Sequence, residues 1–192
     1  MPAAPTTAKG QATRRRILDA AVEEFALRGI AGARIERITA TARTNKAQLY
    51  GYFGSKDGLF DAVVADCVDR ITSAAAFDAD DLAGWAVRLY DDYLRHPELV
   101  RLTTWVRLER RPTGPLFDDP AHTEKLDRIA RAQAAGRVRA GDPYDLLVLV
   151  IALSCAWSPA SSTYAAHAEE PAAEHDRRRA LLHESVRRVV SP

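Results

Sequence analysis

The chain contains few cysteine, methionine and aromatic residues. Its 192 residues include two cysteines and one methionine, and aromatic residues make up 7%. Cys67 and Cys155 are far apart and neither belongs to a CxxC pair, so the sequence predicts no disulfide framework and no zinc site. Reduced, buried thiols fit a cytoplasmic protein, although a redox-sensing role for the two cysteines stays open.

Long hydrophobic stretches are also missing. The most apolar run, residues 146–157, is interrupted by Ser154 and is shorter than the roughly 20 residues that a bilayer-spanning helix needs. The first ten residues lack the apolar segment of a signal peptide. We therefore expect a cytoplasmic protein with no membrane segment.

Patterns of catalytic or metal-binding residues are scarce as well. The five histidines show neither metal-ligand spacing nor a nucleophile partner, which favours solvated or capping roles; they are His96, His122, His167, His175 and His183. No phosphate-binding glycine loop or paired acid and base stands out. We expect no metal, no cofactor and no enzyme activity.

What the sequence does contain is a strong helical pattern. Hydrophobic residues make up 47% and charged residues 28%, which is typical of a globular chain that forms a core without cross-links. Ile17, Ala21 and Phe25 recur at helical spacing, and Gly29 is placed to end that helix. Signals for β-strands are nearly absent, so the pattern predicts an all-α fold.

The same reasoning predicts nine helices. Four prolines are suited to the first turn of a helix: Pro97, Pro120, Pro143 and Pro171. Asp119, Asp142, Asn45 and Ser55 are candidate N-caps. The expected helices are 13–28, a short one from 35 to 42, 46–53, one from 55 to 76, 80–95, 97–111, 120–140, 142–158 and 171–190.

The formal net charge of +1 hides an uneven distribution. Residues 1–60 contain ten Lys or Arg and five Asp or Glu, whereas acidic residues exceed basic ones in the remainder. A basic N-terminal module on an acidic body indicates that one end of the molecule meets a polyanion. Ordinary scatter of surface charge is the alternative.

Two short helices joined by residues 42–45 form the plan of a helix-turn-helix, in which the second helix enters a DNA major groove. On a helical wheel Leu49 and Phe53 point inward, whereas Ala47, Gln48 and Gly51 point outward. Small outward residues allow a close approach to the bases, and Gln48 is the long polar side chain that can read a base edge, with adenine as its usual partner. Flanking groups suited to phosphate contacts are Lys46, Tyr50, Tyr52, Lys56 and the N–H groups at the start of the next helix.

Residues 38–59 resemble the signature of the TetR family of one-component bacterial regulators. Matching positions in this run are Leu49, Tyr50, Tyr52, Phe53, Lys56, Asp57 and Leu59. Upstream matches are Arg15, Ile17, Ala20, Ala21, Phe25 and Gly29. The resemblance covers about residues 13–65 and implies a DNA-binding head followed by a helical part that dimerises and holds an effector.

Two departures from the family pattern concern individual DNA contacts. The turn that is commonly Gly-Val-Ser is Arg43-Thr44-Asn45 here, and Ala33 followed by Arg34 replaces the Ser or Thr that caps the second helix. In the family this Ser or Thr also contacts a phosphate. Here either Arg34 makes that contact or the contact is absent. The expected DNA-binding residues are Arg34, Thr44, Asn45, Lys46, Ala47, Gln48, Tyr50, Gly51, Tyr52 and Lys56.

The C-terminal part offers a candidate dimer interface. Residues 146–153 are apolar all round a helix, and the last helix carries an apolar face, so the two helices resemble half of an intersubunit four-helix bundle. The expected interface residues are Leu147, Val148, Ile151, Leu182, Val186 and Val189. Packing of the last helix on its own core is the alternative. We expect the arginines at 177–179 to form a solvated rim.

Aromatic and polarisable side chains in the same part are candidates for an effector pocket. They are Trp85, Tyr90, Tyr93, Trp105, Phe117, Cys155 and Trp157. Each of them also suits a place in the core of the protein.

Together these features predict a flexible arm (1–12), a helix-turn-helix domain (13–58) and an effector-binding and dimerisation domain (59–192). The expected function is that of a homodimeric repressor that binds a near-palindromic double-stranded operator and is released by a small molecule. The alternative is a small-molecule-binding or redox-responsive helical protein with impaired DNA binding, which Ala33 and Arg43 leave open.

Overall fold

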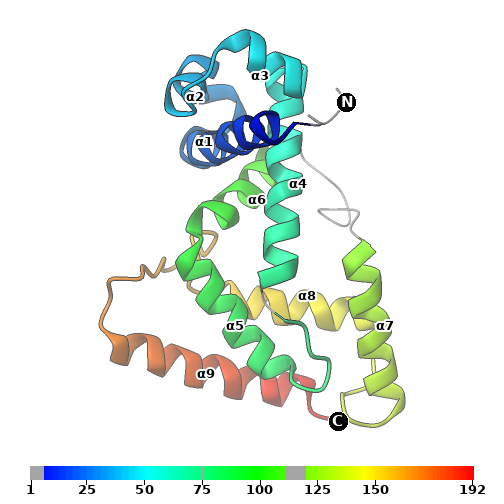
Figure 1. Cartoon of the computed structure of the whole chain (residues 1–192). Helices are drawn as coiled ribbons and strands as arrows, with labels where there is room; N and C mark the ends of the chain where they lie inside the picture. Colours follow the sequence, from blue (N-terminus) through cyan, green and yellow to red (C-terminus); the bar gives the residue numbers. More distant parts are fainter. Residues whose placement is uncertain (1–6, 75, 111–119) are drawn as a thin grey trace. The chain divides into compact units, whose positions relative to one another are not determined.

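The structure, a computed structural model, describes residues 7–74, 76–110 and 120–192. Those residues form nine helices and no strand, as the helical pattern predicted. The helices are α1 (Ala8–Gly32), α2 (Ile35–Thr41), α3 (Lys46–Phe53), α4 (Lys56–Ala74), α5 (Leu82–Arg95), α6 (Pro97–Arg110), α7 (Pro120–Ala134), α8 (Pro143–Ser154) and α9 (Ala172–Val190), labelled in Figure 1.

The described residues divide into two compact units. The first runs to Arg70 and also takes in residues 101–110 of α6, whereas the second contains residues 71–100 and 120–192. The predicted boundary after residue 58 therefore falls inside the first unit, which extends along α4.

In the first unit α1 packs against α2 and α3. The predicted inward faces are confirmed, because Ile17, Phe25, Leu49 and Phe53 are all buried. Phe25 meets Phe60 of α4 edge-on, with 5.1 Å between the ring centres. The short α2 and α3 thus depend on tertiary packing for their stability.

The bounds of α1 differ from the prediction at its start. The helix begins at Ala8 because Thr7 caps it, its hydroxyl accepting a hydrogen bond from the N–H of Gly10 at 3.1 Å. The prediction of a flexible arm is wrong for residues 8–12, and residues 1–6 lie outside the described part. Gly29 interrupts α1 with a φ of 65°, at the position predicted for a terminating glycine.

Gly29 also allows α6 to approach α1 closely. A Cβ at this position would lie 2.5 Å from Oε1 of Glu109 and 2.8 Å from the ring of Trp105. Glu109 accepts a hydrogen bond from the N–H of Ile30 at 2.9 Å, and the indole of Trp105 donates to the carbonyl of Ala26 at 3.2 Å. These contacts anchor residues 101–110 of α6 to α1 within the first unit.

In the second unit α5 packs against α8 and α9, and α7 packs against α8. Figure 1 shows α9 running alongside α5. The core of this unit is built from apolar residues of all four helices, among them Leu89, Tyr90, Ile129, Val150 and Val186.

The sequence predicted some of the helix ends in this unit correctly and others not. Asp142 caps α8 as predicted, since its carboxylate accepts hydrogen bonds from Tyr144 N–H at 2.7 Å and Asp145 N–H at 3.1 Å. However, α7 ends before Gly136, which has a φ of 67°, and α8 ends at Ser154, so both are shorter than expected. The predicted Asp119 cap lies outside the described residues. None of the described helices combines the length and apolarity needed to cross a membrane.

Candidate DNA interface and ligand cavity

The turn between α2 and α3 contains the unusual sequence Arg43-Thr44-Asn45 and is held by hydrogen bonds. Arg43 takes up a left-handed φ of 50°, a conformation that costs a residue other than glycine about 1 kcal/mol. Thr44 N–H then donates to the carbonyl of Thr39 at 3.0 Å. The Asn45 side chain accepts a hydrogen bond from Gln48 N–H at 2.9 Å, which confirms it as the N-cap of α3.

The outward face of α3 is open, as the wheel predicted. Ala47, Gln48 and Gly51 are exposed, and a Cβ built on Gly51 would meet nothing within 4 Å. Tyr50 is exposed and Tyr52 is half-buried at the edges of this face. A helix face without bulky side chains can enter a groove deeply enough for its backbone to approach the bases.

Gln48 is held by a neighbouring side chain. The hydroxyl of Thr44 lies 2.5 Å from Oε1 of Gln48, so Thr44 donates to the amide oxygen and the amide N–H groups are left to face outward. Both residues belong to the predicted set, and the structure brings them into direct contact. The pair presents a positioned hydrogen-bonding group on the exposed face of α3.

Lys46 at the start of α3 pairs with Glu36 of α2, with 2.5 Å between Nζ and the carboxylate. This hydrogen bond lowers the pKa of the Glu36 carboxyl and raises the pKa of the Lys46 amine. Both side chains are exposed, so water and salt screen their attraction. The amine is therefore available for exchange with another anion.

Arg34 and Lys56 lie at the starts of two helices. Arg34 precedes α2 without a side-chain cap on that helix; its N–H donates to Glu24 at 2.9 Å and its side chain is exposed. Lys56 begins α4, with Nζ 3.5 Å from the carbonyl of Ala31. Ser55 caps α4 as predicted, accepting a hydrogen bond from Gly58 N–H at 2.9 Å. A helix start that carries a cation favours an anion such as phosphate.

Arg43, which was not among the residues predicted to bind DNA, has an exposed side chain and directly precedes Thr44 in the turn that leads into α3.

The second unit contains a narrow cavity that leaves no free space for a water molecule. Its walls come from α5 and from the segment between α8 and α9; they are Tyr90, Tyr93, Leu94, Trp157, Ser158, Pro159 and Ala166. Tyr90 and Trp157 meet edge-on, with 5.9 Å between ring centres. The walls are mainly aromatic and aliphatic, as in most small-molecule sites.

The structure brings together only some of the aromatic residues predicted to line a pocket. Tyr90, Tyr93 and Trp157 share the cavity, and burial raises the pKa of Tyr93 well above its usual value, with Cys155 beside it adding to the effect. Trp85 instead packs edge-on against Phe77 in the core. Trp105 belongs to the first unit, where its indole donates to Ala26, and Phe117 lies outside the described residues.

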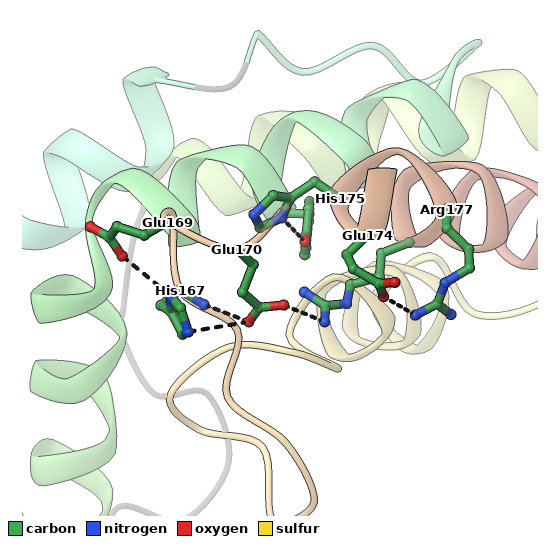
Figure 2. A network of polar contacts seen from close by, with 8 residues as sticks. His167, Glu169, Glu170, Glu174, His175 and Arg177 are labelled. Atoms are coloured by element: carbon green, nitrogen blue, oxygen red, sulfur yellow. Dashed lines mark hydrogen bonds and ion pairs between the residues drawn. The ribbon is translucent and has the colours of Figure 1, made fainter. Parts of the chain in front are cut away.

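A buried polar cluster adjoins the cavity through Tyr90; we define it as Tyr90, Glu170, His175 and Arg178. The hydroxyl of Tyr90 lies 2.8 Å from Nδ1 of His175, and Arg178 Nη2 lies 2.6 Å from Glu170. Figure 2 shows Glu170 and His175 among the neighbouring polar contacts. Burial opposes the charge on Arg178, but its hydrogen bonds to Glu170 and Tyr90 raise its pKa above the usual value.

Two expectations about this cluster were wrong. His175 was predicted to be solvated or capping and Arg178 to belong to a solvated rim, yet they are only 6% and 4% exposed. Both lie on the same stripe of α9 as the buried Leu182 and Val186, at spacings of three, seven and eleven residues from His175. That stripe was the signal in the sequence that placed them inward.

The residues predicted for a dimer interface fall into two groups. Leu147, Leu182 and Val186 are buried in the core of the second unit, so they offer almost no surface to a partner. Val148 is 46% exposed, and Ile151 and Val189 are half-buried. Exposed apolar side chains that the prediction missed lie beside them, at Leu149 of α8 and Leu181 of α9.

Among residues 7–74, 76–110 and 120–192 no group of three His, Cys, Asp or Glu side chains is arranged to hold a metal ion.

Comparisons with known proteins match both units. A family model described as bacterial regulatory proteins, tetR family, matches residues 17–63, and one described as tetracyclin repressor-like, C-terminal domain, matches residues 81–188. The repressor SCO4008 of Streptomyces coelicolor is 44% identical over 66% of this chain, and the repressor NicS of Pseudomonas putida is 40% identical over 47%. The matched regions cover 64% and 46% of those two relatives, respectively.

Solved structures share the fold over nearly the whole length. The crystal structure of SCO4942 from Streptomyces coelicolor is 36% identical, with a TM-score of 0.76, and the match covers 93% of this chain and 98% of that one. GusR of Salmonella enterica shares the fold at 21% identity and a TM-score of 0.69, covering 96% of this chain and 98% of GusR.

Proposed function

The chain belongs to the TetR family of bacterial transcriptional regulators, and we propose from this that it is a sequence-specific DNA-binding repressor released from its operator by a small molecule. The observation that carries the proposal is the face of α3, where exposed Ala47 and Gly51 flank a positioned Gln48. Relatives that match this chain are named transcriptional repressors. The protein acts by binding, without a catalytic step, in the cytoplasm.

On DNA, the proposed roles divide between base reading and phosphate contact. Gln48 reads a base edge in the major groove, and Thr44 orients its amide. Phosphates are bound by exposed or partly exposed groups around this face: Arg34, Arg43, Lys46, Tyr50, Tyr52 and Lys56. Asn45 acts by capping α3, so it positions the helix that presents Gln48.

The protein is proposed to form a homodimer through α8 and α9. The exposed apolar residues Val148, Leu149 and Leu181 form the proposed contact, together with Ile151 and Val189. Two α3 helices of such a dimer would reach successive major grooves of a near-palindromic operator, about 34–36 Å apart.

The dimer proposal is tested by Leu149→Lys, which places a charge in the centre of the proposed contact. Size-exclusion chromatography with light scattering should give monomers for this variant. Leu108→Lys is the matched control, because Leu108 is also exposed but lies on α6 in the first unit. A Leu149→Lys variant that stays dimeric places the interface elsewhere.

The effector is proposed to bind in the second unit at the narrow cavity beside Tyr90, Tyr93 and Trp157, which has to widen to admit it. Because binding free energies are linked, an effector that weakens DNA binding must itself bind more weakly to the DNA-bound protein, by the same factor. Titrating the effector with and without operator DNA measures both sides of this relation.

The DNA-binding proposal is tested by selecting bound duplexes from a random pool and then titrating variants. Gln48→Ala should lose about 1–3 kcal/mol on the selected sequence and relax preference at one base position, because a base contact is removed. Lys56→Ala should weaken binding to selected and random DNA alike and lower the salt dependence, because a phosphate contact is removed. Equal losses on both DNAs for both variants would contradict these roles, and a pool without enrichment would contradict DNA reading itself.

A further inference from the structure

Helix α2 is short and has no side-chain cap of its own. It contains seven residues, and Arg34 at its N-cap position makes no side-chain hydrogen bond to the helix. Its last turn contains no basic residue that would favour the negative end of the helix dipole. A helix of about two turns leaves most of its terminal N–H and C=O groups without partners inside the helix. Other parts of the chain must therefore hold α2 in place.

Glu24 of α1 supplies an acceptor at the start of α2. Its Oε1 accepts the N–H of Arg34 at 2.9 Å, and also Nε and Nη2 of Arg37 at 2.8 and 2.5 Å. Nη2 of Arg37 also donates to the carbonyl of Gly32, the last residue of α1, at 3.0 Å. The Glu24 side chain is 10% exposed, and the hydrogen bond from Arg37 lowers its pKa below the ordinary value. The carboxylate is therefore charged near neutral pH.

Arg16, about two turns earlier on α1, bonds the other end of α2. Its Nε donates to the carbonyl of Ala42, the C-cap residue of α2, at 3.2 Å. Its Nη2 donates to the hydroxyl of Thr13 at 3.2 Å, which holds the guanidinium against α1. An anion at the start of a helix and a cation at its end both favour the helix dipole. Helix α1 thus provides at each end of α2 the polar group that α2 lacks.

These two contacts lie beside the two departures from the family pattern. Ala33 and Arg34 replace the residue that usually caps the second helix, and Arg43 stands where the turn commonly has glycine. The groups that α1 bonds are the N–H of Arg34 and the carbonyl of Ala42, which adjoin those positions. Because Glu24 bonds only the N–H of Arg34, the exposed guanidinium of Arg34 is not used in this cap and can meet a phosphate.

We propose that Glu24 and Arg16 are positioning residues for DNA binding, which hold both ends of α2 and thereby set the place from which α3 presents Gln48. The link from α2 to α3 runs through the turn, where the N–H of Thr44 bonds the carbonyl of Thr39. The part of this inference that concerns DNA rests on the proposed function, whereas the capping of α2 stands on the contacts themselves.

Charge alone predicts the opposite effect of removing Glu24. A protein with one carboxylate less is more positive, so it should bind any DNA more tightly. If Glu24 positions α2, its removal should instead weaken binding to a selected sequence, because that binding depends on where Gln48 stands. Binding to random DNA should be equal or stronger. The sign of the change on the selected duplex therefore separates a positioning role from a purely electrostatic one.

The first test compares Glu24→Ala with Glu23→Ala in the full chain. Glu23 is the preceding residue on α1 and is exposed, so its substitution changes the net charge equally and keeps the contacts of Glu24. On the duplex selected from a random pool, Glu24→Ala should weaken binding about tenfold, because the cost of ordering α2 is then drawn from binding. Glu23→Ala should not weaken it. Glu24→Gln keeps an acceptor oxygen for the N–H of Arg34 and should recover most of the loss.

The second test concerns the other end of α2. Arg16→Met removes the donor to the carbonyl of Ala42 and should also weaken binding to the selected duplex about tenfold. The salt dependence of binding should stay the same, because no phosphate contact is lost. A salt dependence that falls by about one phosphate contact would place Arg16 on the DNA backbone and overturn its positioning role.

Amide hydrogen exchange followed by NMR tests the cap without DNA. The N–H of Arg34 should exchange about tenfold faster or more in Glu24→Ala than in the natural protein, because its acceptor is gone. Glu23→Ala and Glu24→Gln should leave it slow. Equal exchange rates in the natural protein and in Glu24→Ala would overturn the cap.

The titrations are made far below the urea midpoint of each variant, where the whole sample is folded, so a loss of affinity does not report unfolding. Equal losses for Glu24→Ala and Glu23→Ala, or tighter binding of the selected duplex by Glu24→Ala, would overturn the positioning role. If Glu24→Ala does not fold, Glu24→Asp is the second variant, since it keeps the charge but shortens the reach to Arg34, and it should show the same losses. A random pool without enrichment contradicts the proposed function, and the exchange rates then still decide whether Glu24 caps α2.

Discussion

The first unit holds the ion pair between α2 and α3 at the surface, whereas the second unit buries Arg178 with Glu170. The side chains of Lys46 and Glu36 are both more than half exposed, but those of Arg178 and Glu170 are 5% and 7% exposed. The separation between the charged atoms is nearly the same in the two pairs, 2.5 and 2.6 Å. What differs is the environment of each pair and therefore its role.

An exposed pair contributes little to stability and exchanges partners easily, because water solvates its ions when they separate. A buried pair has no such alternative, so removing one ion leaves the other without solvation. The first arrangement suits a surface that must bind and release a polyanion. The second fixes the positions of Tyr90 and His175 beside the cavity.

The largest expected effect comes from breaking the buried pair. Arg178→Met leaves Glu170 without its arginine partner and should lower the thermal midpoint by about 10 °C. Arg177 is the matched control, since it is the preceding residue on α9 and forms an exposed ion pair with Glu174. Arg177→Met should lower the midpoint by about 1–2 °C at most. Differential scanning calorimetry measures the thermal midpoints of both variants. Similar losses for the two would show that burial does not distinguish these pairs.

Gly29→Ala tests the packing of the first unit. The substitution forces a left-handed residue and pushes a Cβ against Glu109 and Trp105, so it should lower the free energy of unfolding by about 2 kcal/mol or more. Gly136→Ala is the control in the second unit, because Gly136 has nearly the same φ but open space at its Cβ. Urea unfolding should give a smaller loss, about 1 kcal/mol, for the control. Equal losses would mean that the left-handed φ alone accounts for the cost at both sites and that the contact with α6 adds nothing.

The buried pair also predicts a pH dependence. The hydrogen bond from Arg178 lowers the pKa of Glu170 below the ordinary 4.5. A carboxyl with a lowered folded-state pKa stabilises the protein above the unfolded-state value and loses that contribution as the pH falls. Thermal midpoints should therefore fall more steeply below about pH 4.5 in the natural protein than in Glu170→Gln. Parallel profiles would show that Glu170 stays charged through acid unfolding or is not paired in solution.

The smallest expected change separates stability from DNA binding on α3. Gly51→Ala should stabilise the protein by about 0.5–1 kcal/mol, because alanine favours a helix and the new methyl group meets nothing. The same methyl group occupies the face proposed to enter the groove, so DNA affinity should fall while urea stability rises. An unchanged DNA affinity would place the bases away from Gly51.

Features that depend only on residues close together in the sequence were predictable. Asn45, Ser55 and Asp142 cap the helices that follow them because each side chain bonds a backbone N–H two or three residues ahead. The inward stripe of Leu49 and Phe53 on α3 likewise follows from helical period alone. These local relations located the candidate DNA interface.

The ligand cavity depends on contacts that the sequence does not reveal. Tyr90 and His175 are 85 residues apart, and Trp105 bonds to a carbonyl 79 residues away in α1. Any of the aromatic side chains on α5, on α6 and just after α8 could have faced a cavity or the core, because both need the same apolar pattern. In the run of three arginines, Arg178 alone shares the stripe of Leu182 and Val186, and α9 packs against α5.

The ion pair between Lys46 and Glu36 has a consequence for the search along DNA. A lysine that meets a phosphate from free solution adds a new attraction, but Lys46 exchanges one anion for another. If Lys46 contacts a phosphate as proposed, its contribution to DNA binding is a difference between two partners. In the proposed complex Glu36 therefore competes with phosphate for Lys46.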